Sequence, residues 1–346
     1  KQAPSRSGWG GTASNRSRDE TGQLGDMTRP LSAPPLLIGL GAGLASALLF
    51  AALVGGTMLA LPLFLLTPLP LAIAALGWGT VAGLVAAATA AGAVAAGIGL
   101  SAAASLVVAD AAPTLVAAHL LGLARASNAN EPTAREWYPL GRVLLALALA
   151  VMVATVIGGI AVGYDPKETA AQISAAFRQV TERAGATAGD LADLGPIDPM
   201  VGMTVRLMPF LFPASWLMVL VFDLWAAARI VAKSGRAVRP REDLAAVELP
   251  PAAGLIFAAA LVAAFFDGSL GILASIVAGA LLSAHFLVGA GVVHTLARRS
   301  EARIIILAFV WGLVLLFTVP AALVALVGLI EPYTGLRRRK PPAGRF

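Results

Sequence analysis

Residues 34–76, PPLLIGLGAGLASALLFAALVGGTMLALPLFLLTPLPLAIAAL, decide the fold of this chain. They belong to a longer run, Pro30–Ala109, in which 80 consecutive residues include no Asp, Glu, Lys or Arg. A helix of a soluble protein turns one face to water and needs polar residues there. A helix that crosses a membrane needs roughly 20 apolar residues. The run therefore predicts several consecutive membrane-spanning helices.

The composition of the whole chain supports the same fold class. Of its 346 residues, 58% are hydrophobic and 13% are charged, whereas soluble domains are about 25% charged. The apolar runs are too long for a membrane β-barrel, whose strands alternate apolar and polar residues over roughly ten positions. The sequence therefore predicts an all-α, polytopic transmembrane helix bundle.

Nine apolar segments have the length of a membrane span. Because their boundaries are uncertain by several residues, we expect about nine spans, within a range of eight to ten. The second segment contains three prolines, which remove backbone N–H donors, so it is expected to be kinked, short or partly unwound. The expected spans are 36–54, 58–76, 80–99, 102–123, 143–163, 203–228, 252–266, 270–296 and 304–329.

Polar segments frame this transmembrane domain, which covers residues 30–335. Residues 1–29 have no apolar period and are expected to form a disordered tail, and residues 336–346 form a basic tail. The loop 164–202 is expected to lie outside the cytoplasm. Within it, Pro166–Ala184 has the pattern of an amphipathic helix, which either lies on the outer membrane surface or packs as a small cap on the helix ends.

Basic residues predict the orientation of the chain. They concentrate in the N-terminal tail, the loops 124–142 and 229–248, and the turn 297–303. With nine spans these segments share one side, which the positive-inside rule assigns to the cytoplasm together with the N-terminus. The basic residues 337–340 would then emerge outside. Either the last apolar run turns back at Pro320, or an earlier span is miscounted.

Several functions lack the residues that they need. The chain has a net charge of +6, but its basic residues are not interleaved with aromatic residues on one face, so nucleic acid is not an expected partner. It has no cysteine and three histidines, so no metal site is expected. The glycines of 39–43 lie inside an apolar span, where they indicate helix packing and not a nucleotide loop. Without a phosphate-binding loop or nucleophile–base set, we expect no catalytic residue, no enzymatic activity and no cofactor.

Ionisable residues inside the spans are the sharpest functional signal, because a charge at the bilayer centre costs about 3 to more than 10 kcal/mol. Asp110 lies near the middle of the fourth span, and His285 near the middle of the eighth. We expect Asp110 to face the bundle interior and to bond to another helix, with His285 as one candidate partner. The alternative is a protonated, non-functional carboxyl, or one bonded to backbone freed by Pro113. Asp223, in the sixth span, is either functional or neutralised at the membrane surface by Arg229.

The region around Asp223 also carries a family resemblance. It reads Asp223-Leu-Trp225-Ala-Ala-Ala-Arg229 and continues to Gly235-Arg236 and Arg239-Pro240. Together with Gly291-Val-Val-His294, these residues resemble the signature of the YybS-like group of uncharacterised bacterial membrane proteins, in its alphaproteobacterial form. The resemblance covers roughly residues 30–340 and implies a multi-pass protein of the bacterial inner membrane. Members of that group often have Asn where this chain has Asp223. The signature residues are Asp223, Trp225, Arg229, Gly235, Arg236, Arg239, Pro240 and His294.

A second resemblance concerns the front half of the chain. The piece Leu66-Thr67-Pro68-Leu69-Pro70, followed by Gly77-x-Gly79 and Gly83, is similar to the substrate-binding membrane subunits of energy-coupling-factor vitamin transporters. In such proteins, broken helices near the middle of the membrane expose backbone groups that coordinate a solute. The resemblance implies a substrate-binding role for Thr67, Pro68 and Pro70, and the intramembrane Asp110 and His285 join this candidate set.

Two functions follow from these observations. The first is a solute-binding or transport membrane subunit, with its cavity around the broken second span and an energising ATPase on another chain. The second is a non-transporting membrane scaffold or assembly factor whose basic loops bind cytosolic partners. The break at 67–70 favours transport, whereas the scarcity of polar residues able to bind a solute favours the scaffold.

Overall fold

The computed structural model describes residues 33–338, apart from 129–130, 184–196, 241–242 and 244–246. The expected tail 1–29 and most of the tail 336–346 lie outside the described residues. The first helices are α1 (Ala33–Ala51), η2 (Ala52–Gly55), α2 (Ala60–Leu65), α3 (Pro68–Trp78), α4 (Thr80–Gly97), α5 (Leu100–Ser105), η3 (Leu106–Ala111) and α6 (Ala112–Gly122). The later helices are α7 (Leu140–Ala161), α8 (Pro166–Arg183), α10 (Ile197–Lys233), α11 (Pro251–Ala263), α12 (Ser269–Ala297), α13 (Arg303–Leu316) and α14 (Thr318–Thr334).

The described part of the chain is an all-α polytopic bundle, as predicted. It has seven helical segments that are long and apolar enough to cross a membrane, or eight if the bent pair α13 and α14 is counted as one span. Eight lies within the expected range. The expected span 252–266 is not among these segments, because the helix there, α11, has only 13 residues. It is about 20 Å long at 1.5 Å per residue, whereas the hydrocarbon core is about 30 Å thick.

Close contacts between small residues hold the helices together. A Cβ atom added to Gly39 would lie 2.8 Å from the carbonyl oxygen of Ala82, and one added to Gly43 would lie 2.4 Å from that of Ala86. The backbones of α1 and α4 therefore approach more closely than any side chain allows, and the expected packing role of glycines in 39–43 is confirmed. The turn between the third and fourth spans contains Gly99 at φ +138°, a conformation that favours glycine.

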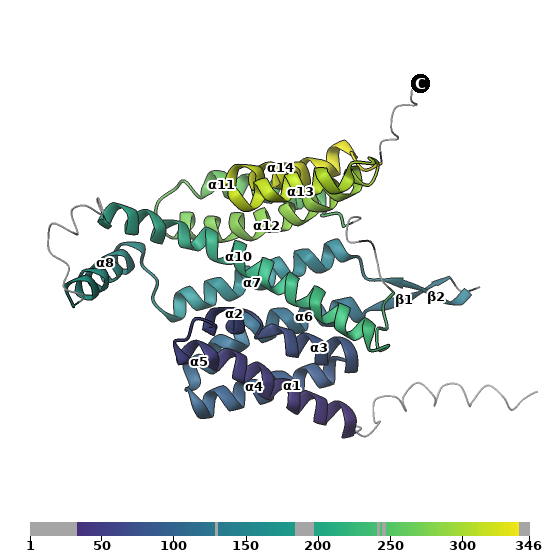
Figure 1. The fold of residues 1–346 in the computed structure, drawn as a ribbon, viewed down its shortest axis with the longest axis horizontal. Coiled ribbons are helices and arrows are strands. Elements are labelled where there is room, and N and C mark those ends of the chain that lie inside the picture. The colour runs from purple at the N-terminus through teal and green to yellow at the C-terminus, as the bar shows by residue number, and fades with distance from the viewer. Residues whose placement is uncertain (1–32, 129–130, 184–196, 241–242, 244–246, 339–346) are drawn as a thin grey trace, which may run out of the picture.

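The C-terminal helices also pack through close backbone contacts at glycines. A Cβ atom on Gly289 of α12 would lie 1.8 Å from the carbonyl oxygen of Val324 on α14, and one on Gly328 would lie 1.9 Å from that of His285. In Figure 1 these helices lie at the top of the bundle, the N-terminal helices lie at the bottom, and α7 and α10 run between them. Because α10 contacts both α3 and α12, it joins the two halves.

Polar elements mark the two ends of the bundle (Figure 1). Strands β1 (Ala124–Asn128) and β2 (Glu131–Trp137) form an antiparallel hairpin at one end, which the sequence did not predict. Helix α8 lies at the opposite end and confirms the expected amphipathic helix. It packs against α10 through a 2.9 Å ion pair between Arg178 and Asp198, the arrangement expected of a cap on the helix ends.

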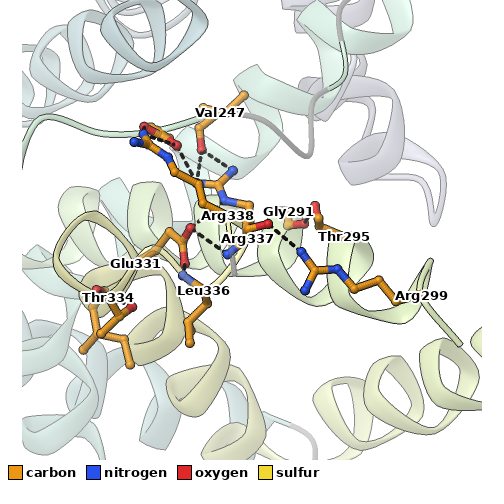
Figure 2. Close-up of polar contacts among 11 residues, drawn as sticks. Val247, Gly291, Thr295, Arg299, Glu331, Thr334, Leu336, Arg337 and Arg338 are labelled. Carbon is orange, nitrogen blue, oxygen red and sulfur yellow. Dashed lines mark hydrogen bonds and ion pairs between the residues drawn. The ribbon is translucent and has the colours of Figure 1, made fainter. Parts of the chain in front are cut away.

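The chain turns back between α13 and α14, which are bent by 118° relative to each other. Figure 2 shows the result at the end of α14, where Arg337 pairs with Glu331 at 3.0 Å and donates to the carbonyl of Val247. Arg299, from the turn after α12, donates to the carbonyl of Arg337. The last apolar run therefore turns back, at Phe317 and not at Pro320. Residues 336–338 lie at the end of the bundle that holds the β1–β2 hairpin, which we call the basic end.

Candidate functional site

Four buried side chains in the N-terminal half and α10 carry polar atoms without partners. They are Thr67, Asp110, Thr114 and Asp223, each at most 1% exposed. Among the described residues, the hydroxyls of both threonines, one oxygen of Asp110 and both oxygens of Asp223 have no hydrogen-bond partner. Buried polar groups are normally bonded, so an unpartnered set within a membrane span points to a function. We call these four residues the polar centre.

Asp110 lies in η3, a stretch of π-helix that interrupts the fourth span. Pro113 has no N–H, so the carbonyl of Ala109 lacks its usual helical donor. Trp216 of α10 replaces that donor through its indole Nε1, at 2.9 Å. The freed backbone is therefore bonded by α10 and not by Asp110, which excludes one of the non-functional alternatives for this carboxylate. π-Bulges of this kind occur frequently at functional sites.

Thr67 lies at the break in the second span. Helix α2 ends at Leu65 and α3 begins at Pro68, so the expected local unwinding is confirmed. Pro68 and Pro70 occupy the first turn of α3, where a missing N–H removes no helical bond. Ser46 of α1 donates to the carbonyl of Thr67 at 2.7 Å, whereas the Thr67 hydroxyl stays unpartnered. The break thus presents one polar side chain to the interior.

Helix α10 brings Asp223 to the other members of the polar centre. Helices α3, α6 and α10 contact one another in pairs. Asp223 lies on α10 between Trp216, which bonds to η3, and Val231, which packs against Gly77 near the end of α3. The helical segments that carry the four residues therefore pack against one another, and Trp216 joins the two that hold the carboxylates.

Arg229 does not neutralise Asp223, so that alternative is wrong. Asp223 has no exposed surface and neither of its oxygens has a hydrogen-bond partner. Arg229 stacks over Trp225, with the guanidinium carbon 5.3 Å from the ring centroid. Trp225 is partly exposed on a different face of α10. Within the signature, Asp223 therefore faces the interior of the bundle, whereas Arg229 and Trp225 lie on another face of α10.

The expected pair between Asp110 and His285 is also wrong. The Nδ1 atom of His285 lies 2.7 Å from the carbonyl of Leu281 on its own helix, and its ring packs at 5.4 Å from that of Phe257 on α11. His285 is buried between α11, α12 and α14, whereas Asp110 lies in η3, beside the carbonyl that Trp216 of α10 contacts. The depth of both residues in the membrane could be predicted from the sequence, but depth does not determine which helices are neighbours.

Two arginines of the signature tie α10 to its neighbours at the basic end. Arg236 stacks over Trp78 at the end of α3, 4.6 Å from the ring centroid. Arg239 donates to the carbonyls of Leu121 at 3.3 Å and Tyr138 at 2.9 Å. These carbonyls belong to the end of α6 and the segment before α7. The two side chains therefore stabilise the fold and lie apart from the polar centre.

The remaining signature residues also have structural surroundings. Gly235 adopts φ +72° where α10 ends, a left-handed conformation that favours glycine at a helix C-terminus. Pro240 is exposed in the following loop. His294 lies 2.9 Å from the carbonyl of Ala290 through Nδ1, and its ring lies 5.6 Å from that of Trp311. Of the eight signature residues, Asp223 alone belongs to the polar centre.

Thr114 is the member of the polar centre that sequence reasoning missed. Its signal was present, because it follows Asp110 by four residues and so shares a helix face with it. Trp216 carried no comparable signal, since only the fold shows that it meets η3. Among the described residues, no group of three His, Cys, Asp or Glu side chains gathers where it could hold a metal ion.

Comparison with known proteins agrees with this architecture. A family model described as "Predicted membrane protein (DUF2232)" matches residues 44–331, which contain the whole polar centre. No curated protein and no solved structure matches the chain. The match covers most of the sequence and all but the ends of the helix bundle, and the chain therefore belongs to this family of predicted membrane proteins, DUF2232.

Proposed function

We propose that this protein is a solute-binding or transport subunit of a bacterial inner membrane, of the YybS-like, alphaproteobacterial type. The observation that carries the proposal is the polar centre. Its buried and unpartnered oxygens lie beside two interrupted helices, the α2–α3 break and the π-helix η3. Interrupted helices around a buried polar site are the usual architecture of solute sites in membrane transporters. The similarity of Thr67, Pro68 and Pro70 to energy-coupling-factor substrate subunits supports the same role.

The chain carries no nucleotide-binding loop, so any ATP hydrolysis belongs to a separate ATPase chain. The lipid bilayer is the second partner, and no enzymatic activity is proposed. The scaffold function remains the alternative, and the β1–β2 hairpin favours it, because this element projects from the basic end as a surface for a cytosolic partner (Figure 1).

A direct test is a thermal-shift screen of the purified chain against vitamins, amino acids and nucleosides. Transport predicts a solute that raises the Tm of the wild type and does so less in Thr67→Val, which removes the buried hydroxyl at little change of volume. A solute that stabilises both proteins equally would place its site elsewhere. Co-purification of a cytosolic client without any stabilising solute would favour the scaffold.

The orientation makes a prediction of its own. We propose that the basic end is cytoplasmic, because Lys and Arg accumulate there. The chain has no cysteine. A single cysteine introduced in place of Val238, Arg338 or Gln179 therefore shows on which side of the membrane that position lies. A membrane-impermeant thiol reagent should label Gln179→Cys on α8 in intact spheroplasts, and should label the other two only after lysis. Labelling of Arg338→Cys but not Val238→Cys in intact cells would contradict the turn between α13 and α14.

The break in the second span gives another prediction. Replacing Pro68 and Pro70 with Ala restores two N–H donors and should join α2 to α3 as one helix. If the break shapes the solute site, affinity for a solute found in the screen should fall about tenfold, or about 1.4 kcal/mol. The Tm should stay level or rise, because Ala has the higher helix propensity.

Pro62→Ala is the matched control, since Pro62 lies on an exposed part of α2 and should leave solute affinity unchanged. A double variant that loses stability while it binds the solute normally would show that Pro68 and Pro70 serve the fold alone.

A further inference from the structure

The two carboxylates of the polar centre lie where charge is most costly. Asp110 is 1% exposed and Asp223 has no exposed surface. Both belong to helical segments that are long and apolar enough to cross a membrane. A single carboxylate in a low-dielectric interior is strongly destabilising. Two carboxylates on contacting helices also repel each other, because the energy between charges grows as the dielectric constant falls. Some positive charge must balance this pair.

No basic side chain of the described residues supplies that charge. The helices α3, α4 and α5 contain no ionisable residue. On α6, His119 is exposed and lies 3.2 Å from the hydroxyl of Thr80. On α7, Arg142 is exposed in the first turn at the basic end. On α12, His285 and His294 bond to carbonyls of their own helix.

The charged residues of α10 and α8 lie far from the pair along the helix. Arg206 precedes Asp223 by 17 residues, about 25 Å at 1.5 Å per residue. Arg229 stacks on Trp225 on another face, and Lys233 ends the helix at the basic end. Helix α8 packs at the opposite end of the bundle. The balancing charge must therefore come from solution.

We propose that Asp110 and Asp223 together bind a proton, and that this proton exchanges with solution when the solute site is occupied or emptied. Binding places one H⁺ on a carboxylate oxygen and changes the charge of the pair from −2 to −1, and release reverses both changes. The Thr114 hydroxyl, one turn from Asp110 towards the basic end, both donates and accepts hydrogen bonds. It offers a position through which the proton passes. The link to solute rests on the proposed transport function, whereas proton binding does not.

The four unpartnered residues fit this assignment better than a purely structural role. A structural carboxylate is held by donors that fix its position, and Asp223 has none among the described residues. Asp110 lies in the π-helix, and the break at Thr67 precedes α3, which packs against α10, so irregular backbone occurs in the helices around the pair, as at ion and proton sites of transporters.

Infrared difference spectroscopy on the full chain in lipid nanodiscs tests the proposal. Lowering the pH from about 9 to about 4 should add a carbonyl stretch of a protonated, buried carboxyl group. Asp110→Asn and Asp223→Asn should each remove or shift that band, because each residue sets the environment of the other. Asp198→Asn is the matched control, since Asp198 lies on α10, is exposed and pairs with Arg178; it should keep the wild-type band.

The outcomes separate the two proposals. Absence of a buried carboxyl band from the wild type, or a band unchanged in both polar-centre variants, would overturn proton binding; the wild-type spectrum alone decides this if the variants do not fold. If the infrared band is present but no solute raises the Tm in the screen, proton binding is supported and the transport function is not. Solute affinity that is independent of pH and of both substitutions would keep transport and remove the link to the proton.

Discussion

Glu331→Ala should cause one of the largest losses of stability available in this chain, about 3–5 kcal/mol. The Glu331 and Arg337 side chains are 2% and 7% exposed and form an ion pair at 3.0 Å. Glu331 also accepts the backbone N–H groups of Leu336 and Arg337 (Figure 2). Removing the carboxylate leaves a buried guanidinium without this charged partner and frees two backbone donors. The Tm of the detergent-purified protein should fall by roughly 10 °C.

Arg338→Ala provides the matched control. Arg338 pairs with Glu248 at 3.0 Å, but its side chain is 78% exposed, and exposed pairs contribute about 0–1 kcal/mol. Its Tm should stay within roughly 3 °C of the wild type. Equal losses in the two variants would mean that the buried pair does not hold α14 to the loop at Val247.

Gly289→Ala should be the second strongly destabilising change. The new methyl group would lie 1.8 Å from the carbonyl oxygen of Val324, and because that atom belongs to a backbone, α12 and α14 must move apart. Overpacking of this kind costs about 1–3 kcal/mol and occasionally more. Thermal unfolding should show a lower Tm, and limited proteolysis should cut sooner near α14.

The same substitution at Gly312 should not lower the stability of the protein. A Cβ atom on Gly312 of α13 would meet nothing within 4 Å, and Ala exceeds Gly in helix propensity by about 1 kcal/mol. Gly312→Ala should therefore be neutral or stabilising. If Gly289→Ala unfolds at the same temperature as Gly312→Ala, close backbone contact between α12 and α14 does not stabilise the bundle.

The features that depend on composition and local pattern could be predicted from the sequence. The long uncharged run predicted the spans, and the stripe of apolar residues in 166–184 predicted α8. The prolines of 68–70 predicted the break before α3, because a missing N–H acts at a known place. Depth in the membrane also follows from the sequence, which is why Asp110 and Asp223 could be identified as residues of interest.

Contacts between distant helices could not be predicted. Nothing along the chain indicates that Trp216 reaches the carbonyl of Ala109, or that His285 turns to α11 and α14. The hairpin β1–β2 was missed because Ala124–Trp137 contains no clear alternation of apolar and polar residues. The turn was predicted at Pro320, because proline usually interrupts a helix. It lies at Phe317 instead, since Pro320 is tolerated in the first turn of α14.

The hairpin of α13 and α14 also gives the protein an uneven shape in the membrane. Its helices have 14 and 17 residues, or about 21 and 26 Å, and both of its ends lie at the basic end. Each helix is shorter than the roughly 30 Å hydrocarbon core, and no side chain of α13 is buried against the rest of the bundle. The lipid around this hairpin must therefore adapt to a shorter apolar length than it meets at the long helices. We expect the stability of this protein to depend on bilayer thickness.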